Sequence, residues 1–157
     1  MTNFFQIIID CFTKKYFQCK GRSNRKEFLI FIFFTILINF MLEVGCYILK
    51  ENLYLLSLLI YIRIFIDILY IIPSFTIIVR RLHDFKISGW VYFFFNFFIL
   101  IVIIYLAIKN GSFTKKNMSM STPTIVFCYS VTILQYLILV FTPGTQGTNK
   151  YGEPPTY

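Results

Sequence analysis

Long apolar runs separated by short polar segments make up most of this chain. Each run is close to the roughly 20 helical residues that cross the hydrocarbon core of a bilayer, and together they cover residues 28–49, 53–79, 89–108 and 124–142. Only Lys50, Glu51 and Asn52 separate the first two runs, so those two helices must lie antiparallel. The pattern predicts four transmembrane helices.

A shorter amphipathic segment, residues 3–19, precedes the first run. At helical spacing its polar side chains fall on one face and its apolar side chains on the other; the apolar ones are Phe5, Ile8, Ile9, Phe12 and Tyr16. This pattern is typical of a helix lying in the membrane interface. An ordinary packing helix is the alternative.

The composition agrees with a membrane protein. Of the 157 residues, 57% are hydrophobic and only 14% are charged, whereas about a quarter of a soluble domain is charged. The mean hydropathy is +0.70. Because polar groups this scarce cannot cover a water-soluble globule, we predict an all-α integral membrane fold, with residues 1–157 as a single membrane domain.

The formal net charge of +8 comes from basic residues placed mainly between the apolar runs. One side of the predicted membrane collects Lys14, Lys15, Lys20, Arg22, Arg25, Lys26, Arg80, Arg81, Lys86 and Lys150. The other side collects only Lys50, Lys109, Lys115 and Lys116. Since cytoplasmic segments carry the excess of Lys and Arg, both termini should be cytoplasmic, with 143–157 as a cytoplasmic tail. No nucleic-acid-binding motif accompanies the charge, so we expect membrane lipids rather than nucleic acid as partners.

The four cysteines give no sign of a metal or redox site. Cys11, Cys19, Cys46 and Cys128 show neither CxxC nor Cys/His spacing. We therefore expect no metal, no redox pair and no cofactor, and interpret most of these residues as small apolar side chains in helices.

Three polar blocks lie around the apolar runs: GRSNRKEF at 21–28, RRLHDFKISGW at 80–90 and GTQGTNKYGEPP at 144–155. In this order the blocks make the chain resemble the domain of unknown function 805 family, the YhaH-like small bacterial inner-membrane proteins. The matching residues are Gly21, Arg22, Arg25, Glu27, Phe28, Arg80, Arg81, Leu82, His83, Asp84, Ser88, Gly89, Trp90, Gly147, Asn149, Tyr151, Gly152 and Pro154 or Pro155. The resemblance implies a bacterial inner-membrane protein with an ordered C-terminal cap, and it implies no activity. Lys86 stands where the family usually has glycine, so we expect a backbone there that needs no positive φ.

The first candidate site is the set of polar residues that the predicted topology brings to the cytoplasmic face. The planar fork of arginine suits phosphate and carboxylate, and Ser88 is a suitable N-cap for the third run. We expect a site for anionic lipid headgroups or a membrane partner formed by Arg22, Arg25, Arg80, Arg81, His83, Asp84, Ser88 and Trp90. The alternative is that the arginines only determine topology.

The pair His83-Asp84 raises the question of catalysis. A histidine beside a carboxylate can act as a general acid or base, but the sequence offers neither a nucleophile nor a metal beside it. If the second helix continues through this block, Arg80 and Asp84 lie four residues apart and can form an ion pair. We therefore expect a structural role and no enzymatic activity.

Glu43, Arg63 and Asp67 lie inside the predicted spans. A charge at the bilayer centre costs about 2.5–3.5 kcal/mol on the insertion scale, so each should have a partner. We expect an intramembrane polar network that clasps the first two helices together.

For the function as a whole, we expect a non-enzymatic membrane protein that acts alone, as a homo-oligomer or with a membrane-protein partner. The alternatives are a small transporter or channel subunit using these charges, and a membrane-embedded enzyme using His83 and Asp84.

Overall fold

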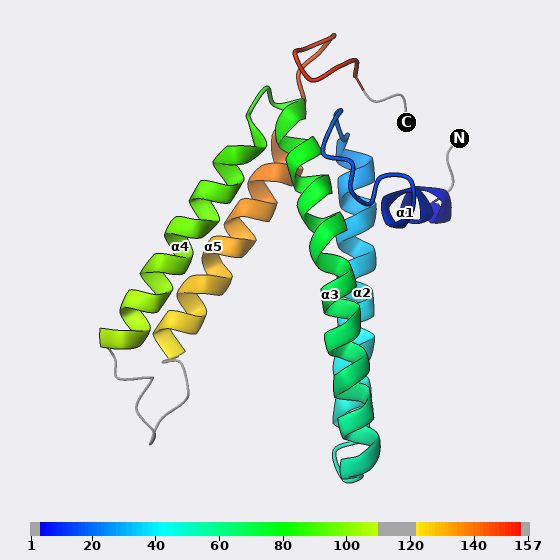
Figure 1. The fold of residues 1–157 in the computed structure, drawn as a ribbon, viewed down its shortest axis with the longest axis vertical. Helices are drawn as coiled ribbons and strands as arrows, with labels where there is room; N and C mark the ends of the chain where they lie inside the picture. The colour runs from blue at the N-terminus through cyan, green and yellow to red at the C-terminus, as the bar shows by residue number, and fades with distance from the viewer. Residues whose placement is uncertain (1–3, 110–121, 155–157) are drawn as a thin grey trace.

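The computed structural model describes residues 4–109 and 122–154, so most of the polar loop after the third run lies outside the described residues (Figure 1). Within these ranges the chain forms α-helices and no strands, apart from one isolated bridge between Asn149 and Gly152. The all-α prediction is confirmed. The helices are α1 (Phe4–Phe12), α2 (Arg25–Ile48), α3 (Leu53–Asp84), α4 (Gly89–Lys109) and α5 (Thr122–Phe141).

The long helices form two pairs arranged as an inverted V (Figure 1). Helices α2 and α3 run side by side as an antiparallel hairpin, and α4 and α5 form the second arm. The arms converge at the end where the C-terminal segment crosses the molecule. We call this end, formed by the start of α2, the end of α3 and residues 143–154, the polar end.

Helices α2, α3 and α4 are long and apolar enough to cross a membrane. In α5 the apolar stretch among the described residues is Tyr129–Phe141, which is shorter than a span requires. The structure therefore contains several of the long apolar helices that the sequence predicts. The fourth transmembrane span stays a prediction.

Helix α1 is shorter than the predicted segment 3–19. It ends at Phe12, and turns and bends follow. Its buried residues are Ile7, Ile8 and Cys11, whereas Phe5 is 73% exposed. The helix thus presents to the bundle a face rotated from the predicted one, because Cys11 packs with the core of the polar end.

The ends of α2 and α3 follow from local sequence. Asn24 is the N-cap of α2, and its side chain accepts a hydrogen bond from the Glu27 N–H. At the end of α3 the Lys86 N–H donates to His83 and the Ile87 N–H donates to Leu82. This Schellman arrangement puts a left-handed residue after the helix. Lys86 has φ +64°, so the expectation of an ordinary backbone there is wrong.

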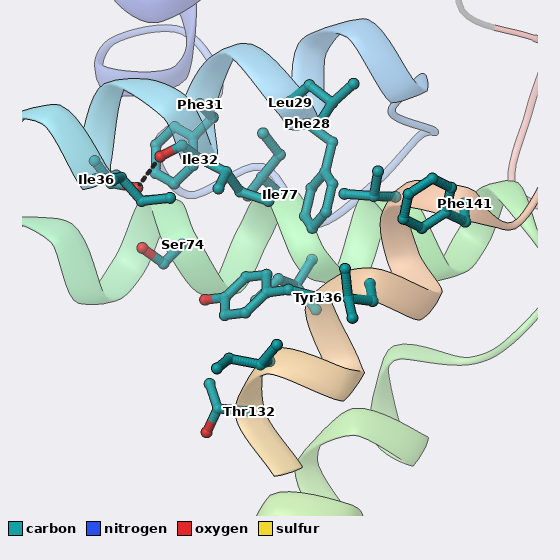
Figure 2. A pocket seen from close by; sticks show the side chains of 15 residues that line it. Phe28, Leu29, Phe31, Ile32, Ile36, Ser74, Ile77, Thr132, Tyr136 and Phe141 are labelled. Carbon is teal, nitrogen blue, oxygen red and sulfur yellow. Dashed lines mark hydrogen bonds between the residues drawn. The ribbon is translucent and has the colours of Figure 1, made fainter. Parts of the chain in front are cut away.

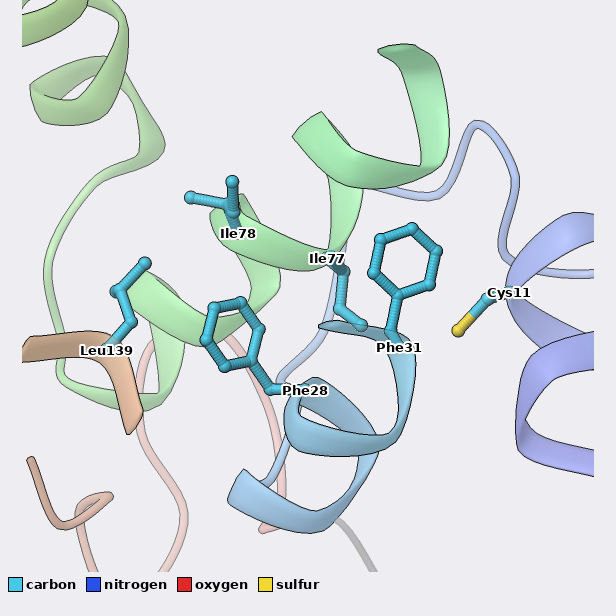
Figure 3. Close-up of a cluster of buried hydrophobic side chains, with 6 residues drawn as sticks. All are labelled: Cys11, Phe28, Phe31, Ile77, Ile78 and Leu139. Carbon is cyan, nitrogen blue, oxygen red and sulfur yellow. The ribbon is translucent and has the colours of Figure 1, made fainter. Parts of the chain in front are cut away.

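The buried core lies beside the polar end (Figure 3). It joins α1, α2, α3 and α5 through Cys11, Phe28, Phe31, Ile77, Ile78 and Leu139. Along the remainder of the arms many large hydrophobic side chains are exposed, as expected for helices surrounded by lipid. The core therefore fixes the geometry of the polar end and leaves the arms separate.

Candidate functional site

Asp84, the last residue of α3, is the centre of the polar end. Its Oδ1 accepts a hydrogen bond from Arg22 Nε at 2.9 Å and forms an ion pair with Arg22 Nη2 at 2.7 Å, and its Oδ2 accepts a hydrogen bond from Arg81 Nη1 at 2.7 Å. All three residues are buried. The possible ion pair between Arg80 and Asp84 does not form, because Arg80 pairs with a different carboxylate, that of Glu27.

Arg22 ties the C-terminal segment to this centre. Its guanidinium donates to the carbonyls of Gly147 and Thr145, and Thr145 in turn donates from its N–H and its Oγ1 to the Asp84 carbonyl, both at 2.9 Å. Gly144 passes so close that an added Cβ would lie 1.9 Å from Asp84 Oδ2. Only glycine lets the backbone approach the carboxylate this closely.

Arg81 secures the end of α5. Its Nε donates to the Leu139 carbonyl at 2.9 Å and its Nη2 donates to the Thr142 carbonyl at 2.8 Å. The guanidinium also lies over the Phe85 ring, 4.5 Å from its centroid. A lysine, with one compact charged group, could not make these contacts at once.

Glu27 is the centre of a second buried cluster. Its carboxylate accepts from Arg80 Nη1 at 2.7 Å, Lys15 Nζ at 2.9 Å and Ser23 Oγ at 3.1 Å. Arg80 Nε and Nη2 are buried and have no hydrogen-bond partner in the described part of the chain. Burial, together with the nearby Glu27 charge, raises the pKa of the Cys11 thiol to about 11.

His83 is held by the backbone and by an aromatic ring. Its Nδ1 lies 3.2 Å from the Gly21 carbonyl oxygen, and because a carbonyl only accepts, this nitrogen carries the proton. The imidazole stacks on Tyr151 with centroids 3.8 Å apart, and Lys150 Nζ lies 4.8 Å from the Tyr151 centroid. The Asp84 carboxylate, occupied by two arginines, does not orient the His83 ring.

An open groove of about 670 Å³ lies beside His83, between α3, the start of α4 and the chain before α2. Its polar lining includes Lys20, His83 and Ser88, and among the described residues no acidic one lines it. Its apolar lining comes from Phe75, Val79, Trp90 and Phe93. We call this space the amphipathic groove, because charge and apolar rings share its walls.

The predicted site residues thus separate into two groups. Arg22, Arg80, Arg81 and Asp84 are buried in ion pairs. The others are more accessible: Arg25 is exposed and donates to the Thr142 carbonyl at 3.3 Å, and His83, Ser88 and Trp90 line the amphipathic groove.

Sequence reasoning missed the roles of Lys20, Glu27, Lys150 and Tyr151. Glu27 and Tyr151 belong to the polar blocks described above, and that was the signal available. Within the apolar helices, Arg63 pairs with Glu43 across the α2–α3 hairpin, while Asp67 makes no ion pair in the described ranges. The ion pair thus joins Glu43 and Arg63, and Asp67 lies one turn from Arg63 on the same helix.

Comparisons with known proteins give one result. Residues 16–153 match the model of a family described as protein of unknown function, DUF805. Neither a curated protein nor a solved structure matches the chain.

Proposed function

Because the chain belongs to the DUF805 family of unknown function, its activity has to be argued from its own residues, and we propose that it is a bacterial inner-membrane protein that binds an anionic phospholipid at the amphipathic groove. In this proposal α2 to α5 all cross the membrane, and both termini are cytoplasmic. The protein acts by binding and not by catalysis.

The observation that carries the proposal is the lining of the amphipathic groove. Lys20 lies at its wall, and Lys150 lies over the ring of Tyr151, which is also part of the wall. Two cations without a lining acid favour an anionic headgroup, and the rings of Phe75 and Phe93 suit the first carbons of acyl chains.

The length of α3 supports placing the amphipathic groove at the depth of the lipid headgroups. Its 32 residues extend about 48 Å at 1.5 Å per residue, more than the roughly 30 Å hydrocarbon core. The last turns, which carry His83, therefore project beyond the hydrocarbon. Trp90, 67% exposed at the start of α4, is a residue type enriched at that level.

A non-catalytic role is supported by the bonding of Asp84. The Gly21 carbonyl orients the His83 imidazole, but Asp84 is saturated by Arg22 and Arg81 and so is not free to assist His83 in proton transfer. These buried ion pairs serve instead to hold the segments that form the groove wall.

Native mass spectrometry of the purified protein tests the proposal. We expect retained phosphatidylglycerol in preference to phosphatidylcholine. Each exposed lysine near the headgroup contributes about 1 kcal/mol, so the double variant Lys20→Gln/Lys150→Gln should bind phosphatidylglycerol about 30-fold more weakly.

Lys50→Gln is the matched control, since Lys50 lies in the turn at the opposite end of the α2–α3 hairpin. Its affinity for phosphatidylglycerol should equal that of the parent. Equal retention of both lipids by the parent protein, or equal losses in the double variant and the control, would refute the proposal.

A further inference from the structure

Asp67 is a charged side chain near the middle of an apolar helix. It lies 14 residues after the start of α3 and 17 before its end, about 21 Å and 26 Å along the axis. Its side chain is exposed and makes no ion pair or hydrogen bond with the described residues. Arg63, one turn away, donates instead to Glu43 Oε2 at 2.5 Å.

A second groove, largely apolar and of about 560 Å³, lies between α2, α3 and α5 (Figure 2). We call it the interarm groove. Aromatic and aliphatic side chains such as Phe28, Ile77 and Ile133 line it, together with the hydroxyl groups of Ser74 and Tyr136. The volume is that of a site for a small organic molecule.

Helical spacing puts Asp67 on the face of α3 that lines the interarm groove. Residues 7 or 11 positions apart differ by only about 20° around a helix of 3.6 residues per turn. Asp67 precedes Ser74 by seven positions and Ile78 by eleven, and both line the groove. Asp67 itself is not a lining residue and lies about 10 Å along the helix axis beyond Ser74. Glu43 follows Ile36 and Ile32 by the same intervals on α2.

The charges along this face do not balance. Glu43 and Asp67 are acidic, Arg63 alone is basic, and Arg63 is paired with Glu43. At this depth a carboxylate needs a proton or a cationic partner. An anion would be repelled, and a small hydrated cation would lose its water to apolar walls. A cation whose charge is spread over apolar groups avoids both costs.

From the groove, the spacing and the unpaired acid, we infer that the interarm groove binds a monovalent lipophilic organic cation. Its apolar body packs against the side chains of α2, α3 and α5, and its charged centre lies toward Asp67. This site is separate from the amphipathic groove in both position and charge, so the two can be tested independently.

Binding of radiolabelled tetraphenylphosphonium tests the inference. The protein is placed in phosphatidylcholine nanodiscs, and binding to empty nanodiscs is subtracted. We expect one saturable site per protein. Asp67→Asn should weaken binding at least tenfold, and Ser74→Phe, which narrows the groove, should weaken it also. Glu51→Gln removes an exposed acid from the α2–α3 turn and should leave binding unchanged, as should Lys20→Gln/Lys150→Gln.

Several results would overturn the inference. The inference fails if the protein shows no saturable binding of tetraphenylphosphonium above that of empty nanodiscs. It fails also if the Asp67→Asn variant binds the probe as tightly as the parent. Full displacement of the probe by millimolar sodium would indicate a site for inorganic cations. Disulfide-linked dimers of Asp67→Cys, in a background without other cysteines, would show that a second copy of the chain covers this face.

Discussion

At the scale of single residues, Lys86 carries the clearest backbone strain. It follows α3 with φ +64° in the position where helices commonly end on glycine. A side chain in the left-handed region costs about 1–2 kcal/mol. The two hydrogen bonds that close the turn, and the return of the chain into α4, hold the residue there.

Replacing Lys86 with glycine should therefore stabilise the protein. We expect the free energy of unfolding to rise by about 0.5–1 kcal/mol, because glycine adopts this φ without a steric penalty. Thermal unfolding of the detergent-solubilised protein measures the change. Lys86→Gln, which removes the charge and keeps the Cβ, should not raise the melting temperature. An equal gain in both variants would mean that charge, and not backbone strain, is the cause.

The sequence predicted that Asp84 pairs with an arginine, because the predicted topology brings the blocks at 21–28 and 80–90 to one face of the membrane. It offered Arg80 or an arginine of the block at 21–28 as the partner; Arg22 of that block is one partner, and Arg81, the other, was missed. The four-residue spacing favoured Arg80, but the close passage of Gly144 and the carbonyls after α5 direct Arg22 and Arg81 to Asp84. Arg80 is left to Glu27. The Arg81–Asp84 pair has the local i, i+3 spacing, but the pairs of Arg22 with Asp84 and of Arg80 with Glu27 join residues more than 50 positions apart, and no local pattern contains them.

At the scale of elements, α1 is fixed by a few contacts to the core. Cys11 is only 1% exposed, and Phe12 packs edge-on against Tyr70 with ring centroids 5.3 Å apart. The predicted face differed because amphipathic spacing over a short helix tolerates rotation, and packing against α2 and α3 selects one orientation.

The burial of α1 predicts different reactivities for two cysteines. With a pKa of about 11, the Cys11 thiol is about 0.1% thiolate at pH 8, and it is also inaccessible. Cys19, partly exposed after α1, should react with a maleimide at least tenfold faster. Mass spectrometry of digested, labelled protein gives both rates.

Unfolding in sodium dodecyl sulfate is the control, in which both cysteines should label fully. If Cys11 labels in the native protein as fast as Cys19, helix α1 does not stay packed against the core.

At the scale of the whole molecule, the two arms meet only at the polar end and separate beyond it (Figure 1). The sequence predicted the approximate bounds of the long helices in the described ranges, because apolar runs of this length leave few alternatives. It could not predict the angle between the arms, which depends on how Phe28, Ile77 and Leu139 pack.

The proposed orientation of the whole molecule has a direct test. Single cysteines in a cysteine-free background are exposed to a membrane-impermeant thiol reagent in intact cells. Lys116→Cys should react, because four spans place the loop at 109–123 outside, while Lys150→Cys should react only after permeabilisation. Labelling of Lys150→Cys in intact cells would contradict cytoplasmic termini.

The bonding of Arg22 also sets an order of events during synthesis. Its acceptors include the carbonyls of Thr145 and Gly147, which leave the ribosome long after α2 and α3 have been made. Until then the hairpin has two of its polar-end arginines, Arg22 and Arg81, without their final carbonyl acceptors. Closure of the polar end is thus a late step in biogenesis, and a nascent chain arrested before residue 145 would expose the groups that membrane quality control can recognise.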